Sequence, residues 1–416
     1  MSRRLLFILL VGAALTSSHA QQLGTKMGST KPNLDFQQAT VTIDRRLVSA
    51  NTTFGFKLFD KLIEYDSGKN IFISPSSVAF ALAMIYNGAS GETRQAMAKT
   101  LEWPAMSLQE INQANNMLQS LLTNPDPQVQ LAIANSLWAR KGIMFKPEFL
   151  KSNQDFYAAE VSDLNFATPG ATATINDWVN RKTNRKINKI VDRINSDAVL
   201  FLINAIYFKG KWSVPFDRAR TKDGMFTLLH GGKKKHPMMS QSGRYKYLQS
   251  NGFQAISLPY GAERMSMYIF LPDGKSDLKT FSASLNAENW EGWMSQFRSV
   301  PGEIVLPRFK VEYEVVLNAA LKTLGMEVAF DPRQADFNEM YSASPNMNVY
   351  VGEVKHKTFV EVNEEGTEAA AVTSGQMLAT SYTPPFKMIV DRPFFCAIRD
   401  NTTGTVLFMG AIVEPK

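Results

Sequence analysis

An α+β fold is the class that the sequence predicts for this chain of 416 residues. Apolar residues recur at helical spacing mainly in the first half, whereas the second half carries runs of β-branched and aromatic residues separated by turn residues. Helices and strands do not alternate as βαβ units, so a parallel α/β sheet is not expected. Neither an internal repeat nor a Pro-rich linker divides the sequence, and this favours one large domain.

The first twenty residues have the pattern of a cleaved export signal. A basic start, Met1 to Arg4, precedes an apolar run from Leu5 to Leu15 and a small-residue ending at Ala20. The apolar run is too short for a membrane-spanning helix. We therefore expect residues 1–20 to be removed, residues 21–44 to form a mobile tail, and the protein to be secreted (extracellular, or periplasmic if bacterial).

Helices and strands are both expected in the first half. Helices are predicted where apolar positions recur every three or four residues, and strands where short apolar runs end at turn residues. Ser76 is the expected N-cap of the second helix. The expected elements are a helix over 45–65, a strand over 70–73, the helix that Ser76 caps, a strand over 129–140, a basic amphipathic helix over 175–190 and a buried strand over 198–208.

Strands dominate the expected structure of the second half. Their runs are rich in Val, Ile, Phe and Tyr, and turn residues lie between them. The segment Asp400–Gly404 (DNTTG) is expected to join the last two strands as a hairpin. The expected strands cover 253–258, 265–271, 303–313, 348–362, 394–399 and 405–413.

The sequence gives little support to an enzyme. It contains no His-Glu-x-x-His motif, no Cys/His cluster, no calcium loop and no nucleophile elbow, so we expect neither a metal nor a cofactor. His356 lies in strand-like sequence, where a hydrogen-bonded core histidine is commoner than a catalytic base. Cys396, the single cysteine, is interpreted as a buried thiol, although pairing or reactivity is the alternative for an exported protein.

Basic residues are in mild excess, with a formal net charge of +7. Such a value does not imply nucleic-acid binding. Six cations recur in one expected helix and the residues after it, and they are interpreted as a solvated face. Polyanion binding is the unsupported alternative for this group, which comprises Arg181, Lys182, Arg185, Lys186, Lys189 and Arg193.

The segment 364–385 (EEGTEAAAVTSGQMLATSYTPP) has almost no large apolar side chain before Met377, yet strand-like sequence flanks it. It is compatible with an exposed loop. Indexed as a strand, it places Thr367, Ala369, Ala371, Thr373 and Gly375 on one face, all small and uncharged, and Glu368 on the other. The segment could therefore serve as a strand with one buried face. On this pattern alone, a plain linker remains an equal alternative.

Several separated stretches carry a family resemblance. The segment 364–371 (EEGTEAAA) is similar to the hinge of a reactive loop, and the whole set resembles the serpin family of serine protease inhibitors. The other stretches follow in the same order as in that family: 70–77 (NIFISPSS), 87–93 (NGASGET), 204–212 (NAIYFKGKW), His356-Lys357 eight residues before Glu364, 391–395 (DRPFF) and 407–410 (LFMG).

The resemblance implies one serpin domain over 45–416, with three β-sheets, eight or nine helices and an exposed reactive-centre loop over about 366–384. It also implies a monomer that is not an enzyme and that inhibits serine proteases as a suicide substrate. The cleaved loop would insert as a strand of the largest sheet and trap the covalent acyl-enzyme. Neither nucleic acid nor a membrane span is expected.

Functional residues follow from the resemblance position by position. Ser74, Ser77, Asn204 and His356 match the region where the large sheet parts, and Trp212, Arg308 and Glu364 match the point where the loop enters it. Arg308 is expected to form an ion pair with Glu364. Two departures are that Val372 is bulkier than the usual Ala and that Arg185 replaces a common Gly. The hinge comprises Glu364, Gly366, Thr367, Glu368, Ala369, Ala370, Ala371, Val372 and Thr373.

The usual loop length of the family places the cleaved bond at Thr380–Ser381, with cleavage after Met377, Leu378 or Ala379 as the alternative. No Lys or Arg lies between Glu364 and Phe386. The expected target is therefore elastase- or subtilisin-like rather than trypsin-like. Two other functions stay open: a non-inhibitory serpin-fold carrier or chaperone, whose hinge would usually contain bulky or charged residues, and an exported hydrolase, which lacks a recognisable motif here.

Overall fold

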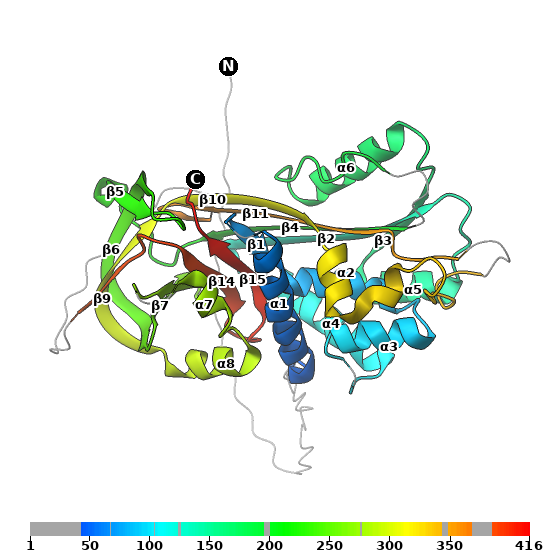
Figure 1. Cartoon of the computed structure of the whole chain (residues 1–416), viewed down its shortest axis with the longest axis horizontal. Helices are drawn as coiled ribbons and strands as arrows, with labels where there is room; N and C mark the ends of the chain where they lie inside the picture. The colour runs from blue at the N-terminus through cyan, green and yellow to red at the C-terminus, as the bar shows by residue number, and fades with distance from the viewer. Residues whose placement is uncertain are drawn as a thin grey trace, which may run out of the picture. The chain divides into compact units, whose positions relative to one another are not determined.

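Helices and two hydrogen-bonded sheets make up the unit Ile43–Lys416 (Figure 1), which confirms the α+β class. The computed structural model describes residues 43–66, 68–103, 105–123, 126–194, 200–274, 277–342, 348–367 and 385–416. The expected signal peptide and most of the expected tail lie outside these residues.

One sheet has six strands, of which five follow the order β10-β11-β4-β2-β3 and the sixth, the short β12, pairs with β4. The central strand β4 packs on both faces. Its residues Phe201, Ile203 and Ala205 join one buried cluster, whereas Leu202 and Ile206 join another. This two-sided burial explains its continuous apolar run. The strands are β2 (Val129–Arg140), β3 (Glu160–Leu164), β4 (Leu200–Lys211), β10 (Phe309–Val316), β11 (Glu353–Val362) and β12 (Gly366–Thr367).

The second sheet has nine strands, so the described residues form two sheets rather than the expected three. Different stretches of β6 pair with β5 and with β7, so continuous pairing joins two of the expected sheets into one. Its strands are β1 (Ile71–Ile73), β5 (Lys222–Thr227), β6 (Lys233–Ser250), β7 (Phe253–Tyr260), β8 (Met265–Pro272), β9 (Arg298–Pro307), β13 (Phe386–Ile389), β14 (Phe394–Asp400) and β15 (Val406–Ile412).

Helices cover both faces of the six-stranded sheet. Figure 1 shows α6 on one face and α1 to α5 on the other. Nine α-helices lie within the described residues, in line with the expected eight or nine. They are α1 (Arg45–Tyr65), α2 (Pro75–Tyr86), α3 (Gly91–Thr100), α4 (Leu108–Leu122), α5 (Pro147–Tyr157), α6 (Gly170–Lys182), α7 (Leu278–Ser282), α8 (Ala287–Gln296) and α9 (Asn318–Leu321).

Several expected element boundaries were wrong, and the strand expected over 348–362, for example, begins only at Glu353. Helix α2 is capped by Ser74 rather than Ser76, because the Ser74 side chain accepts a hydrogen bond from the Ser77 N–H and Pro75 suits the first helical position. The strand expected over 303–313 is two strands, β9 and β10, which Arg308 separates. The Arg308 backbone N–H donates to the Pro237 carbonyl, and Arg308 belongs to neither strand.

The helix expected over 175–190 ends earlier, because α6 stops at Lys182. The chain then turns at Asn184 and Arg185, whose φ angles are 51° and 63°. The apolar spacing continues past this turn, since Ile187 and Ile190 still pack into the same buried cluster as α6. Periodicity alone therefore gave no sign of the helix end.

The single cysteine, Cys396, is a buried free thiol in β14, as expected from its strand-like surroundings. Burial raises the pKa of the Cys396 thiol well above its ordinary value. The thiol is therefore protonated and unreactive at neutral pH.

Candidate functional site

The site is centred on the junction of β4 and β11, a parallel pair in the middle of the six-stranded sheet. Seven residues of β11, from Glu353 to Phe359, stand opposite Phe201 to Tyr207 of β4. The outer neighbours, β10 on β11 and β2 on β4, are both antiparallel. A parallel pair is slightly less stable per residue than an antiparallel pair, so this junction is a weak seam in the sheet.

After β11 the chain makes a tight turn and returns along β4. The turn consists of Asn363 to Gly366, whose two end residues exchange backbone hydrogen bonds of 2.9 and 3.2 Å. The two residues of β12 then pair antiparallel with Lys211 and Gly210 of β4. Because β2 occupies the other edge of β4, β12 lies on the edge that β11 occupies lower down.

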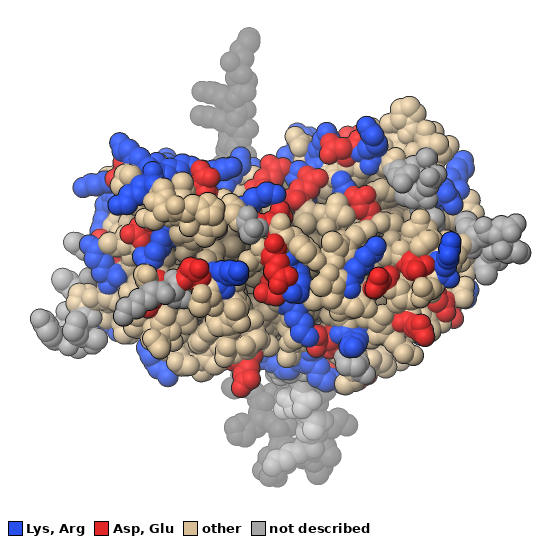
Figure 2. Space-filling model, in the orientation of Figure 1, with Lys and Arg blue, Asp and Glu red and all other residues tan. Residues whose placement is uncertain are grey.

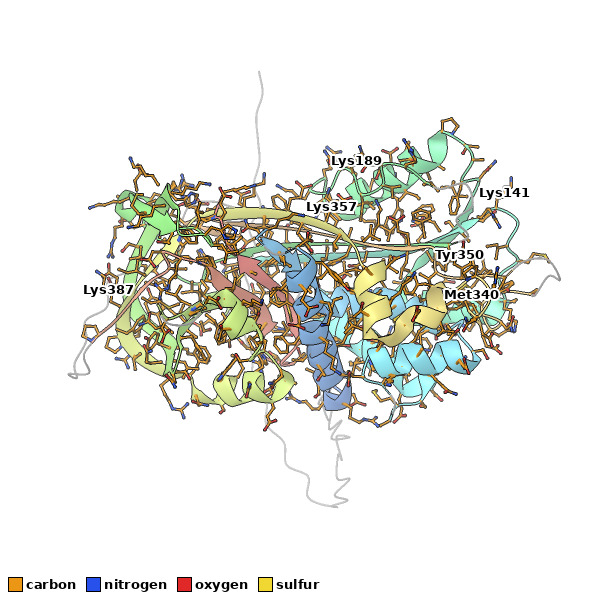
Figure 3. The ribbon with its side chains drawn as sticks, viewed as in Figure 1. Lys141, Lys189, Met340, Tyr350, Lys357 and Lys387 are labelled. Atoms are coloured by element: carbon orange, nitrogen blue, oxygen red, sulfur yellow. The ribbon has the colours of Figure 1, made fainter. Side chains whose placement is uncertain are left out.

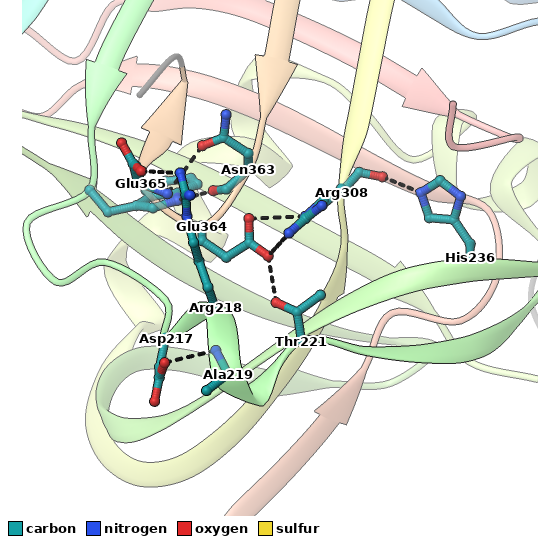
Figure 4. A network of polar contacts seen from close by, with 10 residues as sticks. Asp217, Arg218, Ala219, Thr221, His236, Arg308, Asn363, Glu364 and Glu365 are labelled. Carbon is teal, nitrogen blue, oxygen red and sulfur yellow. Dashed lines mark hydrogen bonds and ion pairs between the residues drawn. The ribbon is translucent and has the colours of Figure 1, made fainter. Parts of the chain in front are cut away.

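Glu364, in this turn, is held by an ion pair that Figure 4 shows from close by. Arg308 Nε donates to both carboxylate oxygens, at 2.8 and 2.9 Å, and the Arg308 Nη2 and the Thr221 hydroxyl also donate. Burial alone would raise the pKa of Glu364, but the hydrogen bonds from Arg308 and Thr221 outweigh it and hold the pKa below its ordinary value. The carboxylate is therefore ionised at neutral pH.

Glu365 forms a second ion pair beside the first. Its carboxylate accepts from Arg218, which follows β4 in the chain. Its other oxygen, Oε2, is buried and has no hydrogen-bond partner within the described part of the chain. The turn thus places two neighbouring carboxylates on two separate arginines.

Trp212 fastens the turn to the end of β4. Its indole N–H donates to the Asn363 carbonyl at 2.9 Å, and its backbone N–H donates to the Glu365 carbonyl at 3.0 Å. The indole also stacks on Tyr260, with ring centroids 4.4 Å apart and an interplanar angle of 10°. Trp212 therefore holds two carbonyl groups of the turn against the end of β4.

The two residues of β12 are buried in different ways. The Thr367 side chain is 1% exposed, and its hydroxyl lies 3.1 Å from the Tyr260 hydroxyl, within hydrogen-bond distance. Gly366 has φ of 135°, and a Cβ there would lie 2.2 Å from the Gly210 carbonyl oxygen. The backbone conformation and the space both require glycine at this position.

A second group of polar residues crosses the β4–β11 junction lower down. His356 of β11 and Asn204 of β4 stand directly opposite one another and are hydrogen-bonded through Nδ1 and Oδ1. Asn204 Nδ2 donates to the Ser77 carbonyl at 3.0 Å and to Asn135 Oδ1 at 2.6 Å. The Ser74 N–H donates to His356 Nε2 at 3.0 Å. The group therefore links the start of α2 to three adjacent strands.

The hydrogen bonds fix the tautomer of His356. Because Nε2 accepts from the Ser74 N–H, the proton of the neutral ring is on Nδ1, which donates to Asn204 Oδ1. Burial lowers the pKa of His356 to about 3, so the ring is neutral at physiological pH. A buried neutral histidine between two strands is a structural residue rather than a catalytic base.

The site residues named from the sequence fall into these two groups. Ser74, Ser77, Asn204 and His356 form the group that crosses the junction, and Trp212, Arg308 and Glu364 meet at the turn. Gly366 and Thr367 follow the turn in β12. The other hinge residues named, Glu368, Ala369, Ala370, Ala371, Val372 and Thr373, and the expected cleaved bond Thr380–Ser381, lie outside the described residues.

Sequence reasoning missed several partners in the site. Tyr260 comes from the distant strand β7 and Thr221 from the residue before β5, and nothing in their local sequence singles them out. A partner such as Arg218 could have been expected from the sequence, because Glu365 stands beside Glu364 and a second buried carboxylate needs a second cation.

Other kinds of site find no support within the described residues. No group of three or more His, Cys, Asp or Glu side chains there could hold a metal ion. In the same part of the chain, no helix has the length and apolar character needed to cross a membrane.

Comparison with known proteins identifies the family. A family model described as Serpin (serine protease inhibitor) matches residues 49–415. The chain therefore belongs to the serpin family, and its fold is the serpin fold. Since this is a family of protease inhibitors, the expectation that the protein is not an enzyme is confirmed by its membership.

Individual relatives match over nearly their whole length. Serpin B8 of Homo sapiens is 38% identical over 380 residues, which cover 89% of this chain and 99% of that protein. The leukocyte elastase inhibitor of Homo sapiens is 35% identical over 382 residues, which cover 89% of this chain and all of that protein. The native-state structure of the thermophilic serpin tengpin is similar with a TM-score of 0.84 and 32% identity, covering 90% of this chain and 95% of that one.

The expectation of a secreted protein with a signal peptide is contradicted by these relatives. Serpin B8 and the leukocyte elastase inhibitor are intracellular serpins of clade B without secretion signals. The expectation had rested on the local pattern of residues 1–20 alone, a basic start, an apolar run and a small-residue ending. The comparison points away from secretion.

Proposed function

We propose that this serpin is an irreversible suicide-substrate inhibitor of serine proteases. The observation that carries the proposal is the position of β12. It pairs antiparallel with β4 on the edge that faces β11, at the open end of the parallel β4–β11 junction. A strand that continued from β12 would therefore enter between β4 and β11.

Continuing the pairing of β12 gives the register of the inserted strand. Thr367 stands opposite Gly210, so each following residue would stand opposite the preceding residue of β4, which places Thr373 opposite Asn204. The new strand would be antiparallel to β4 and, since β11 is parallel to β4, antiparallel to β11 as well. Insertion would thus replace one parallel pair by two antiparallel pairs.

The side chains of the segment suit this register. Thr367 is buried, so the residues that share its face (Ala369, Ala371, Thr373 and Gly375) would also point inward, and all are small and uncharged. Glu368 and Val372 would point outward. A non-inhibitory carrier would not need this alternation.

The free energy of insertion can be bounded from the new pairing. Each added backbone hydrogen bond contributes ~0.5–1.5 kcal/mol net, so about ten of them release on the order of 10 kcal/mol before apolar burial is counted. The uninserted form would be held by a kinetic barrier rather than by being the most stable state. After the protease has cleaved the loop and become acylated, this release would displace and distort it before deacylation.

The two polar groups would set that barrier. The entering strand must separate His356 from Asn204 and displace the turn that Trp212, Arg308 and Glu364 hold. Each of these contacts opposes opening before cleavage. We propose this control role for Ser74 and Ser77 as well, because both hydrogen-bond within the same group.

The target class follows from the loop sequence. Since no Lys or Arg lies between Glu364 and Phe386, a protease that requires a basic side chain before the cut is disfavoured. Cleavage at Thr380–Ser381 fits elastase- or subtilisin-like proteases, which accept small or medium apolar side chains. A relative named for elastase inhibition supports the same class.

The test is incubation with a panel of elastase-, subtilisin-, trypsin- and chymotrypsin-like serine proteases. We expect a complex that survives boiling in detergent with the elastase- or subtilisin-like members, and mass mapping of the released C-terminal peptide identifies the cleaved bond. Nicking the loop with a protease that is not trapped should also raise the melting temperature markedly. Clean cleavage by every protease, without a complex and without a rise in melting temperature, would favour a carrier or chaperone function instead.

A further inference from the structure

A cationic face lies beside Pro385, the residue that precedes β13. It is the outer face of β6, β9 and β13, where half-buried Glu303 and Val305 alternate along β9 with buried Gly302, Ile304 and Leu306. Arg244 and Lys246 of β6 and Lys387 of β13 are exposed on this face. Figure 3 labels Lys387 at one end of the ribbon, and Lys141 near the other.

The strand register fixes how near this face is to the loop. Phe386 stands opposite Gly302, and Gly302 stands opposite Gly243. The residue before β13, Pro385, is therefore level with Arg244, two strands away. With strands ~4.8 Å apart, the distance between the two backbones is about 10 Å.

The cations of this face are only partly compensated. Lys387 pairs with Glu303 at 3.3 Å. Arg244 and Lys246 have no carboxylate within ion-pair distance in the described part of the chain. Arg220 adds another cation, because its Nη2 donates to the Ser242 hydroxyl on the same face. In Figure 2 Lys and Arg also gather over the neighbouring β5.

The surface beside Arg244 and Lys246 is hollowed. A polar cavity of about 250 Å³ lies there, and the buried Ser257 and Ser266 contribute to its wall. Asn401 is held in place by donating to the Ser266 hydroxyl at 2.9 Å and accepting from Tyr268 at 2.9 Å. One carboxylate, Glu263, also lines the cavity. Two cations thus lie at the rim of a cavity whose wall carries hydroxyl groups, and such groups can donate hydrogen bonds to a carboxylate.

We propose that this face, Arg220, Arg244, Lys246 and Lys387, is a docking surface for an acidic patch beside the active-site cleft of the target protease. The proposal rests on the proposed inhibitory function and adds a requirement on the surface of the protease, beyond its preference at the cleaved bond. The docking face raises the rate of encounter, and the loop sequence selects the cut.

The reach of the loop makes this contact unavoidable for a bound protease. The expected cut at Thr380–Ser381 is six residues from Lys387, which span at most about 20 Å of fully extended chain. A protease of ~250 residues has a radius of gyration of about 18 Å. Its surface around the cleft therefore overlies the docking face when the loop occupies the cleft.

A partner with separate carboxylates fits this face better than a continuous polyanion does. Glu303 lies between Lys387 and the β6 cations, and Glu263 borders the cavity, so the positive charge is interrupted. Separate acidic side chains can avoid these carboxylates, whereas a chain of regularly spaced sulfates cannot. A polyanion site is thus an outcome that the experiment must distinguish.

The experiment compares R244E/K246E with the matched double variant K99E/K141E, which changes the net charge equally on exposed lysines of other elements. Association rate constants are measured at about 50 mM and 500 mM salt with the panel protease that forms the complex. We expect R244E/K246E to be slower by ~10-fold at low salt, with the difference lost at high salt, and K99E/K141E to stay within about twofold of the parent. The number of inhibitor molecules consumed per complex should not change, because insertion is untouched.

Three outcomes decide the proposal. Equal slowing by both double variants, or by neither, overturns it. Loss of binding to heparin, used as a polyanion probe, without slowing of the protease also overturns it and assigns the face to a polyanion. If no protease forms a complex, the proposed inhibitory function fails. The docking face can still be tested, because the rates at which the same proteases cleave the loop can be compared between R244E/K246E and K99E/K141E.

Discussion

Arg308 and Glu364 form an ion pair in which the carboxylate is buried and the guanidinium is not: the side chains are 3% and 42% exposed. Replacing Arg308 leaves the buried Glu364 carboxylate without its partner, whereas replacing Glu364 leaves an arginine that water can solvate. We therefore expect R308M to lower the free-energy barrier to unfolding by ~2–3 kcal/mol and E364Q by less. The double variant should recover part of the loss that R308M causes.

The measurement is a double-mutant cycle on unfolding rates in denaturant. Lys146 and Glu339, an exposed pair 3.4 Å apart, give the control cycle, for which a coupling of ~0–0.5 kcal/mol is expected. Additive effects of R308M and E364Q would show that the pair does not hold the turn.

Replacing Thr367 by arginine should turn the inhibitor into a substrate. The Thr367 side chain is already buried in β12, so an arginine there would place an unpaired charge in the sheet at a cost of several kcal/mol. The pairing from which the new strand must extend would be weakened, and the step that traps the protease would be slower. We expect T367R to yield mainly cleaved protein, with at least ~10-fold more inhibitor consumed per complex formed.

The variant is titrated against a panel protease, and a detergent gel then measures how much inhibitor ends as complex and how much as cleaved protein. E368R is the matched control, because that position falls on the outward face and should leave trapping intact. T373R tests the same inward face if T367R disturbs the starting fold. Normal trapping by both inward variants is incompatible with the proposed register.

Gly366 should not accept a side chain. An alanine Cβ would meet the Gly210 carbonyl oxygen at 2.2 Å in a backbone conformation with φ of 135°. We expect G366A to detach β12 from β4, to lower the barrier to unfolding by ~1–3 kcal/mol and to speed proteolysis after β11. G170A is the control, since no atom lies within 4 Å of the Cβ position there. Equal thermal stability of the two variants would contradict the role of the close approach.

His356 should make the native state sensitive to mild acid. Its pKa is about 3 in the folded protein and ~6.5 when unfolded, so the unfolded state binds more protons between these values and stability falls as the pH falls through this window. From pH 7 to pH 5 the loss is ~2 kcal/mol for this group alone. H356Q should be less stable at pH 7 but should show a smaller acid dependence.

Unfolding rates between pH 4.5 and pH 7.5 measure this dependence. H230Q provides the control for the loss of a histidine at an exposed position. An equal slope for H356Q and the parent protein would mean that other groups carry the acid sensitivity.

Much of the fold could be predicted, because its strongest signals are local. The expected helix over 45–65 and the strand over 129–140 match α1 and β2 residue for residue. The apolar run in β4 predicted a strand buried on both faces, and two core clusters confirm this. Errors occurred where a single residue interrupts a continuing pattern, as Arg308 does between β9 and β10.

The site was harder to predict than the fold, because its geometry depends on pairing between distant segments. Family motifs supplied His356 and Asn204, but only the register places them opposite one another. Tyr260 reaches Thr367 from a strand more than a hundred residues earlier. No local sequence pattern encodes such a contact.

The burial of Cys396 determines how the molecule responds to its chemical surroundings. With one cysteine in the whole chain, no bridge within the molecule fixes one strand to another, and the single thiol is enclosed in β14. Parting of β4 from β11 would thus require no disulfide to be reduced and would involve no surface thiol. Because opening of the sheet depends on hydrogen bonds and packing, it should run at the same speed with and without glutathione, and thiol-modifying reagents should leave it unaffected.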